Sequence, residues 1–233
     1  MNIQVLSSGS TGNCYRVSDG YTNILLECGI PIQKIKEGLN FRLSDITGCL
    51  VSHEHKDHAK AVKDISKVGI DVYMSFGTWE ALNIKHHRIK CISKQETIKI
   101  GTFLVMSFDV QHDAVEPFGY ILYSIPTKQK LLYLTDSYYC KYRFNELTHI
   151  MIEANYTTDI LKDNTKNGLI DIELKNRVMK SHMSIETLKD FLRANELSQV
   201  QQIWLLHLSD NNSDAERFKR EVQELTGKEV YIA

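Results

Sequence analysis

The chain has 233 residues, of which 42% are hydrophobic and 24% are charged, an ordinary composition for a globular protein with one sizeable core. Its formal net charge of −1 excludes a global positive field, so any binding of polyanions must come from local groups. Five scattered cysteines without a C-x-x-C pair suggest neither a disulfide framework nor a thiolate zinc site.

Apolar and alternating runs in chain order predict two series of strands, separated by turn residues such as Asp19-Gly20. The first series covers residues 3–6, 14–17, 23–26, 49–51, 72–74, 97–100 and 103–110, and the second covers residues 119–124, 130–134, 149–152, 202–206 and 229–232. Helical periodicity occurs in residues 58–67, 172–179, 185–195 and 213–225. Strands in both halves with helices between them favour two packed sheets with helices outside.

The same survey predicts a single domain over residues 1–233, because three prolines and no Gly/Ser-rich linker give no sign of a boundary. No run of about 18 apolar residues and no signal-peptide pattern occur, so we expect a cytoplasmic protein with no membrane partner. No sequence feature indicates an oligomeric state. His149 is interpreted as a strand-entry residue, and Lys85-His86-His87-Arg88-x-Lys90 as a solvated basic segment.

The segment His53-Glu54-His55-Lys56-Asp57-His58 carries the strongest chemical signal. Three imidazoles and a carboxylate stand where a predicted strand ends and a helix begins. Because extended backbone sends alternate side chains the same way, His53 and His55 can bind one ion, and the following turn brings Asp57 and His58 toward a second. These nitrogen and oxygen ligands suit zinc, manganese or iron.

Three further candidate ligands follow apolar strands: His112, Asp136 and His207. A carboxylate at position 136 is able to bridge two ions. Each residue alone is more often an ordinary strand-end residue than a ligand, but their joint occurrence favours a dinuclear metal site.

The H-x-H-x-D-H motif followed in order by His112, Asp136 and His207 resembles the ligand series of the metallo-β-lactamase superfamily. The resemblance implies an α/β fold, the four-layered αββα sandwich, with two divalent metal ions, zinc or manganese. It also implies a first site of His53, His55, His112 and Asp136 and a second site of Asp57, His58, Asp136 and His207. Asp57 is in addition predicted to be catalytic.

Other segments resemble the YycJ/WalJ-like group, which is related to ribonuclease Z and whose members are regarded as DNA exonucleases. They include Ser7 to Asn13, Glu153-Ala154-Asn155, the Lys175-x-Arg177 pair and Ser181-His182-Met183-Ser184. The resemblance implies that Glu27 and Glu153 support the ligands from behind, with Glu27 standing where most relatives have Asp. A second interpretation of the Gly/Ser-rich loop from Ser7 to Asn13 is that it presents backbone N–H groups to a phosphate, although loops of this composition are common.

The resemblance implies that His182 lies beside the scissile phosphate. It is therefore predicted to be catalytic and to contact substrate, because a non-ligand imidazole beside a metal centre can donate a proton to a leaving alkoxide. Lys175 and Arg177 precede it and are predicted to bind the phosphodiester backbone; a solvated helix face is the alternative. The predicted function is phosphodiester hydrolysis by a hydroxide between two ions, on DNA rather than RNA. A small-molecule hydrolase such as a cyclic phosphodiesterase and a metal-stabilised binding protein remain alternatives.

Overall fold

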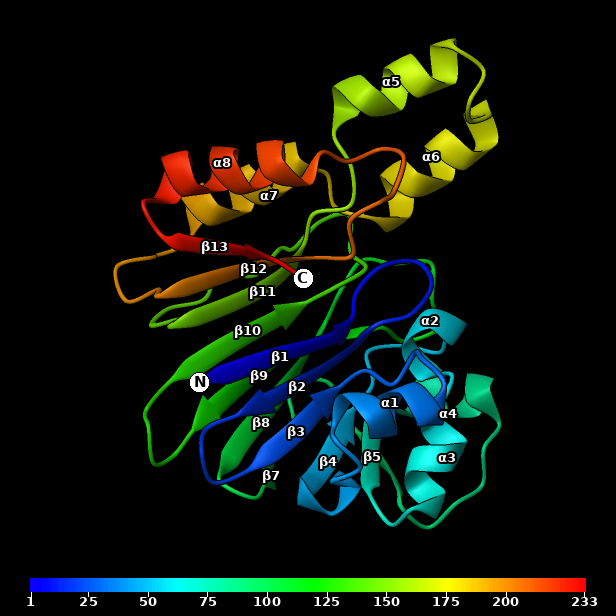
Figure 1. Cartoon of the computed structure of the whole chain (residues 1–233), viewed down its shortest axis with the longest axis vertical. Helices are drawn as coiled ribbons and strands as arrows, with labels where there is room; N and C mark the ends of the chain where they lie inside the picture. Colours follow the sequence, from blue (N-terminus) through cyan, green and yellow to red (C-terminus); the bar gives the residue numbers. More distant parts are fainter. The chain divides into compact units, whose positions relative to one another are not determined.

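The computed structural model describes all 233 residues, which form two compact units (Figure 1). Unit 1 comprises Met1–Asp109 and Ala114–Gln129, and unit 2 comprises Val110–Asp113 and Lys130–Ala233. The short segment Val110–Asp113 therefore belongs to unit 2 although its neighbours on both sides belong to unit 1. It carries His112, one of the predicted metal ligands.

The first sheet of unit 1 contains six strands in sequential order. They are β1 (Asn2–Ser7), β2 (Cys14–Ser18), β3 (Asn23–Leu26), β4 (Ile46–Leu50), β5 (Asp71–Ser75) and β6 (Ile89–Ile92). β1, β2 and β3 pair antiparallel, whereas β3 to β6 pair parallel. Because parallel strands end at the same edge of a sheet, the residues that follow β3 and β4 are neighbours.

The parallel pairs of unit 1 are joined by helical crossovers. These are α1 (Ile32–Gly38) with a 3-10 turn (Leu43–Asp45), α2 (Lys56–Ala59) with α3 (Val62–Lys67), and α4 (Phe76–Leu82). Buried apolar residues of this sheet and its helices, such as Val51, Val62, Ile65 and Val72, form one hydrophobic core. Unit 1 ends in an antiparallel run of β7 (Thr97–Ile100), β8 (Phe103–Asp109) and β9 (Phe118–Ser124).

Unit 2 contains four parallel strands, of which the central pair, β10 and β11, have side chains that are almost all buried, as expected of a parallel sheet with covered faces. They are β10 (Lys130–Leu134), β11 (His149–Glu153), β12 (Gln202–Leu206) and β13 (Glu229–Ile232), and the helices are α5 (Thr158–Lys166), α6 (Ile172–Ser181), α7 (Ile185–Ala194) and α8 (Ala215–Thr226). α7 and α8 lie side by side against this sheet (Figure 1). The carboxyl ends of β10, β11 and β12 meet at one edge.

Every predicted strand is present, with bounds that shift by a few residues, and β4 begins at Ile46 rather than at residue 49. The predicted helix 58–67 is wrong as one element: it is split into α2 and α3, because the backbone N–H of Ala61 donates to Cys28 O. β6 and the helices α1, α4 and α5 were not predicted. β6 lies partly in the segment interpreted as solvated and basic, and its exposed Lys90 and Cys91 hide the strand pattern.

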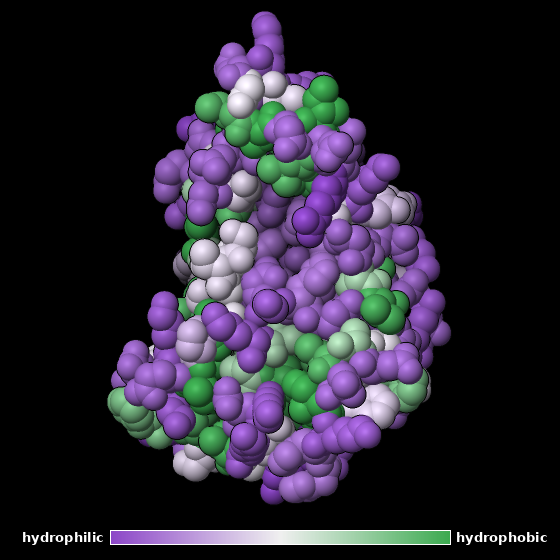
Figure 2. All heavy atoms as spheres, turned by 90° about the vertical axis from the view of Figure 1, so that its right-hand side faces the viewer, coloured by the Kyte–Doolittle hydropathy of each residue, from purple (hydrophilic) through white to green (hydrophobic).

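Exposed apolar side chains gather on the α5–α6 part of unit 2. Leu169, Ile172, Leu174 and Met179 are all exposed, and Figure 2 shows hydrophobic atoms at the upper end of the view, over these helices. The predicted α6 is therefore present, but its apolar residues are not core residues. None of the helices combines the length and the apolar character that a membrane crossing requires.

His149 is the first residue of β11, as predicted, and its imidazole is buried. Burial lowers the pKa of His149 to about 4, from an ordinary value of 6.5. In the unfolded chain His149 is protonated below about pH 6.5, whereas in the folded chain it stays neutral down to about pH 4. The free energy of unfolding therefore falls as the pH decreases from 6.5 to 4. We expect His149→Leu to lose about 2 kcal/mol less stability than the wild type between pH 7 and pH 5.

Urea unfolding at the two pH values measures this difference. Because all other titrating groups are common to both proteins, the comparison isolates the imidazole. Equal losses of stability in the wild type and in His149→Leu would contradict the prediction.

Candidate metal centre

The predicted metal-binding loop of unit 1 begins directly after β4 and places three imidazoles against one another. His53 Nε2 lies 3.0 Å from His55 Nδ1, and the ring centroids of His53 and His58 are 4.2 Å apart. His53 and His58 are buried. Imidazole nitrogens at this separation share a proton or a cation, so the arrangement suits a metal ion.

The turn into α2 brings the carboxylate of the motif to the same place. Asp57 Oδ2 lies 3.3 Å from His58 Nε2. The structure thus brings together all four predicted ligands of this segment, which we call the unit 1 cluster: His53, His55, Asp57 and His58.

Glu27 lies behind this cluster. It follows β3, is fully buried, and has a positive φ of 63°. Both of its carboxylate oxygens accept from Ser52 N at 3.2 Å, and Oε2 lies 3.6 Å from His58 Nδ1. The extra methylene relative to Asp therefore does not prevent the carboxylate from holding the start of the loop and the far side of His58.

The Gly/Ser-rich loop after β1 has a structural role toward the unit 1 cluster. Asn13 N donates to Asp57 O at 2.7 Å, and Asn13 Nδ2 lies 3.2 Å from His58 Nε2. Gly9 N and Gly12 N are bound to Asn13 Oδ1 and Gly9 O within the loop. These contacts tie the loop to the metal-binding segment, and the N–H groups of Gly9, Gly12 and Asn13 are already used within the protein rather than presented to a phosphate.

Gly29 allows the close approach of the metal-binding segment. A Cβ at this position would stand 1.7 Å from Asp57 O and 2.7 Å from His58 N, both backbone atoms. We expect Gly29→Ala to displace Asp57 and His58, to lower the metal content, and to cost about 1–3 kcal/mol of stability or more. Elemental analysis and urea unfolding measure the two effects.

Gly69→Ala is the matched control, because nothing lies within 4 Å of a Cβ there. That variant carries only the backbone strain of a positive φ of 98° and should retain the metal content of the wild type. If Gly29→Ala also keeps its full metal content, the close approach does not position the ligands.

The second group of candidate residues lies at the strand edge of unit 2. We call it the unit 2 cluster: His112, Asp136, Glu153, His182 and His207. Asp136 follows β10, Glu153 ends β11, and His207 follows β12. One ligand atom from each of Asp136, Glu153, His182 and His207 lies within 4.8 Å of the others.

Two residues of the unit 2 cluster adopt a left-handed backbone conformation that residues other than glycine normally avoid. Asp136 has a φ of 43° and His207 a φ of 52°. Left-handed backbone at residues other than glycine costs about 1 kcal/mol or more and persists where the surroundings enforce it, often at functional sites. At both strand ends the turn aims the side chain into the cluster, because Asp136 Oδ1 lies 3.3 Å from His207 Nδ1.

Glu153 is the centre of the unit 2 cluster. It is fully buried, and its Oε1 accepts from His182 Nδ1 at 2.6 Å and from His207 Nδ1 at 3.1 Å. Oε2 accepts from Ser137 N and Met183 N, each at 3.0 Å. Burial opposes the charge of Glu153, but the charge of His182 and the hydrogen bonds with His182 and His207 outweigh it and lower the pKa of the carboxyl.

The contact with Glu153 fixes the orientation of His182. With Nδ1–H donating to the carboxylate, Nε2 is the nitrogen left for chemistry. Burial alone would lower the pKa of His182, but the charge and hydrogen bond of Glu153 raise it above its ordinary value. His182 is therefore suited to hold a proton at Nε2.

His112 approaches the same cluster from its short segment. Its Nδ1 donates to Ser181 O at 2.8 Å, and its Nε2 lies 3.6 Å from Asp136 Oδ2. Burial lowers the pKa of His112, which favours the neutral imidazole that metals bind. A histidine that donates one N–H to a carbonyl and points its other nitrogen at a carboxylate fits a metal ligand.

The predicted phosphate-binding residues of α6 are not brought together. Arg177 is exposed, and its Nε lies 3.5 Å from Asp113 Oδ2, directly beside His112. Lys175 is half-buried and two residues away, a spacing that puts the two side chains on different faces of a helix. Arg177 is thus placed near the unit 2 cluster, and Lys175 does not share its position.

Sequence reasoning missed two supporting groups, Ser52 Oγ beside His53 Nδ1 and the carbonyl of Ser181 that holds His112. A backbone acceptor leaves no signal in residue identity. The ligating atoms of both clusters are only imidazole nitrogens and carboxylate oxygens. This donor set fits zinc and manganese, which accept both kinds of ligand.

Comparison with known proteins identifies the class. Residues 22–208 match the family model of the beta-lactamase superfamily domain, and the chain belongs to this family. The resemblance seen in the sequence is confirmed. The match includes every residue of the unit 1 and unit 2 clusters.

Among curated proteins, the chain is 29% identical over 226 residues to exodeoxyribonuclease WalJ of Streptococcus pneumoniae strain D39, covering 90% of this chain and 82% of that protein. It is 29% identical over 229 residues to exodeoxyribonuclease YycJ of Bacillus anthracis, covering 91% and 84%.

Among solved structures, the metallo-beta-lactamase fold protein YhfI from Bacillus subtilis matches with a TM-score of 0.74 and 16% identity, covering 99% of this chain and 95% of that chain. The short form of human tRNase Z matches with a TM-score of 0.63 and 15% identity, covering 100% and 96%. The predicted fold class, the α/β metallo-β-lactamase fold, is confirmed.

Proposed function

We propose that this protein is a metal-dependent phosphodiesterase that cleaves DNA. The observation that carries the proposal is the buried carboxylate of Glu153, which orients His182 and His207 beside Asp136 at the edge of a parallel sheet. Family membership and the two relatives named exodeoxyribonucleases support the choice of DNA over RNA and over small phosphodiesters.

We propose that the unit 1 and unit 2 clusters together bind two divalent ions, zinc or manganese. One ion would be held by His53, His55, His112 and Asp136, and the other by Asp57, His58, Asp136 and His207. When bound, such ions lower the pKa of water and neutralise charge on phosphoryl oxygens. Glu27 and Glu153 keep the ligands in place through the contacts described above.

In this proposal His182 holds a proton at Nε2 for the departing alkoxide oxygen. Its contact with Glu153 keeps the imidazole oriented and favours the protonated form. Arg177 contacts Asp113, the residue next to His112, and supplies a positive charge for a neighbouring phosphate. Lys175 is proposed to contact the backbone of the DNA strand at a different point along α6.

The test is hydrolysis of a panel of end-labelled duplex DNA, single-stranded DNA, RNA and cyclic nucleotides by protein reconstituted with zinc or manganese. We expect about two metal ions per chain and fastest cleavage of DNA. Asp136→Ala should lose metal and activity, whereas Asp163→Ala, an exposed carboxylate on α5, should lose neither. Full activity in the presence of a strong chelator would overturn the proposal, and cleavage of cyclic nucleotides alone would establish the small-molecule alternative.

Substitution of the cations of α6 tests substrate contact separately. Arg177→Glu and Lys175→Glu should each weaken DNA binding and reduce its salt dependence by about one unit of slope for each phosphate that the variant no longer neutralises.

The cytoplasm is the proposed location. The buried thiols of Cys14, Cys28 and Cys49, none of which forms a disulfide, agree with a reducing compartment.

A further inference from the structure

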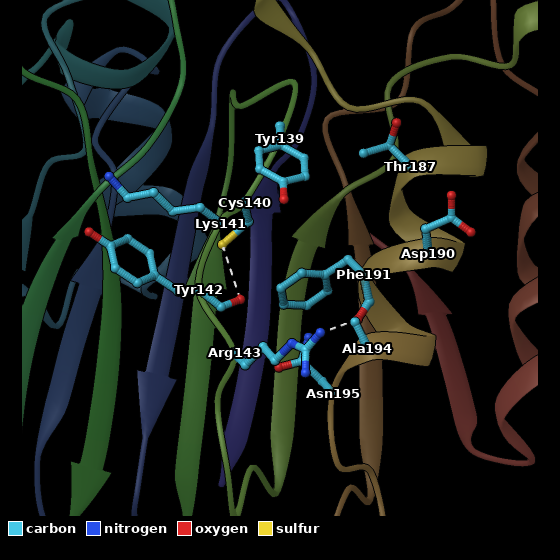
Figure 3. Close-up of a pocket in the computed structure, with 10 residues that line it drawn as sticks. All are labelled: Tyr139, Cys140, Lys141, Tyr142, Arg143, Thr187, Asp190, Phe191, Ala194 and Asn195. Atoms are coloured by element: carbon cyan, nitrogen blue, oxygen red, sulfur yellow. Dashed lines mark hydrogen bonds between the residues drawn. The ribbon is translucent and has the colours of Figure 1, made fainter.

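Unit 2 contains a cavity of about 380 Å³ away from the metal ligands, which we call the α7 pocket (Figure 3). One wall is the segment 139–143 that follows β10, and the other is a face of α7. Thr187, Asp190, Phe191 and Ala194 line the helical wall at the spacing of one helix face. At 1.5 Å per residue, this wall is about 10 Å long.

The lining combines aromatic rings with positive charge. Tyr139, with 53% of its surface exposed, Tyr142 and Phe191 contribute rings, and Lys141 and Arg143 contribute cations. Figure 3 shows the two tyrosines on the loop side and Thr187 and Asp190 on the helix side.

The charge balance of the α7 pocket is positive. Asp190 is the one carboxylate of the lining, and it is paired with Arg193 Nη1 at 2.8 Å. Lys141 Nζ lies 5.1 Å from the centroid of the Tyr142 ring, and Arg143 adds a second cation to the loop, whereas the one carboxylate already has a cationic partner. A negatively charged ligand with a flat aromatic group fits this surface.

The walls of the pocket are tied to each other. Asn195, at the end of α7, accepts from Phe144 N at 2.7 Å and donates to Phe191 O at 2.7 Å. The start of the loop is held by Ser137 Oγ, which donates to Tyr139 O at 2.8 Å. The aromatic surface is thus fixed by hydrogen bonds at both ends of the loop, as a preformed ligand site requires.

Both walls follow residues of the unit 2 cluster closely in the sequence. Tyr139 follows Asp136 by three residues, and Thr187 follows His182 by five. A polynucleotide with one phosphate at the cluster therefore has its neighbouring nucleotides within reach of the α7 pocket.

We propose that the α7 pocket binds an unpaired base of a single DNA strand, stacked on Tyr139, with an adjacent phosphate held by Arg143. This inference rests on the proposed function and names the substrate as DNA with a single-stranded end. In a duplex the faces of interior bases are occupied by stacking, so only an unpaired nucleotide can offer its base to the pocket.

The experiment measures binding in the absence of metal, so that it does not depend on cleavage. Protein in excess EDTA is titrated into a fluorescein-labelled 12-nucleotide single strand and into a blunt hairpin, and anisotropy is recorded. A second single strand carries 2-aminopurine near its end, because the fluorescence of this base is quenched when it stacks. We expect tighter binding of the single strand than of the blunt hairpin, and quenching on binding.

Tyr139→Ala should weaken binding of the single strand about 5- to 100-fold and abolish the quenching, as expected for the loss of one base-stacking platform. Arg143→Ala should weaken binding less and lower its salt dependence. Matched controls are Tyr21→Ala and Arg220→Ala, which alter an exposed tyrosine of unit 1 and an exposed arginine of α8. Both should bind as the wild type does.

The inference would be overturned if Tyr139→Ala and Arg143→Ala both kept the affinity and the quenching of the wild type. It would also be overturned if free deoxynucleoside monophosphate displaced the single strand at an equal concentration of nucleotide. The second result would assign the pocket to a free nucleotide. Failure of the proposed function is a separate result: the metal-reconstituted wild type would cleave no phosphodiester of the panel, whatever strand the metal-free protein binds.

Discussion

His182→Ala is expected to lower kcat for DNA about 10²- to 10⁴-fold while the protein keeps the metal content of the wild type and its fold, because removal of a general acid typically has an effect of this size. His182 and Glu153 are the two members of the unit 2 cluster that lie outside the predicted ligand series. His182 contacts Glu153 through Nδ1, which leaves Nε2 for a leaving oxygen. Substrate binding should change less than kcat does.

A leaving-group comparison separates proton donation from phosphate binding. A nitrophenyl phosphodiester expels a stabilised phenolate that needs little protonation, so His182→Ala should affect it far less than DNA. Equal losses on the two substrates would assign His182 to phosphate binding instead. His87→Ala, an exposed histidine of unit 1, serves as the control and should leave both rates unchanged.

Metal content decides between His182 as proton donor and His182 as ligand. His182 belongs to the group whose ligand atoms all lie within 4.8 Å of one another; the other members are Asp136, Glu153 and His207. Geometry alone therefore allows either role. Loss of one ion per chain in His182→Ala would identify it as a ligand and contradict the prediction.

The sequence predicted the candidate ligands because each stands where a recognisable element ends. His53 follows β4, Asp136 follows β10 and His207 follows β12, and all three strands have strongly apolar sequences. Because parallel strands end at one edge, a list of strand-end residues is already close to a list of neighbours within each unit. This is why motif and strand pattern together indicated the chemistry.

The supporting contacts were less accessible to sequence reasoning. Glu27 and Glu153 were expected behind the ligands only from the resemblance, and nothing in the residue pattern showed that Glu153 accepts hydrogen bonds from two histidines and two backbone groups. The left-handed backbone of Asp136 and His207 was equally hidden, since neither residue is a glycine.

Some secondary structure was missed for a different reason. α1 and α4 have seven residues each, too few to be stable as isolated helices, and they depend on packing against the sheet of unit 1. α6 presented the opposite case, since its periodicity was recognised correctly although its apolar side chains are exposed. Periodicity predicts a helix but does not say which face is covered.

Glu153→Ala is expected to be the most damaging single substitution in unit 2. It removes the acceptor of four buried or nearly buried donors: His182 Nδ1, His207 Nδ1, Ser137 N and Met183 N. Breaking a buried charged contact by removing one partner typically costs about 3–5 kcal/mol. Urea unfolding in EDTA measures this cost without a contribution from bound metal.

Glu153→Gln keeps the shape of the side chain and separates packing from charge. Its carbonyl oxygen can still accept hydrogen bonds, but its amide nitrogen faces donors, so we expect a smaller loss of about 1–3 kcal/mol. Activity should nevertheless fall about 10- to 100-fold, as when a group that orients metal ligands is replaced, because His182 and His207 lose the carboxylate that holds them. Glu224→Ala, an exposed residue of α8, should change neither stability nor activity. Wild-type stability in Glu153→Ala would contradict the role of this carboxylate as the buried centre of the cluster, and wild-type kcat in Glu153→Gln would show that its charge is not needed to orient the two histidines.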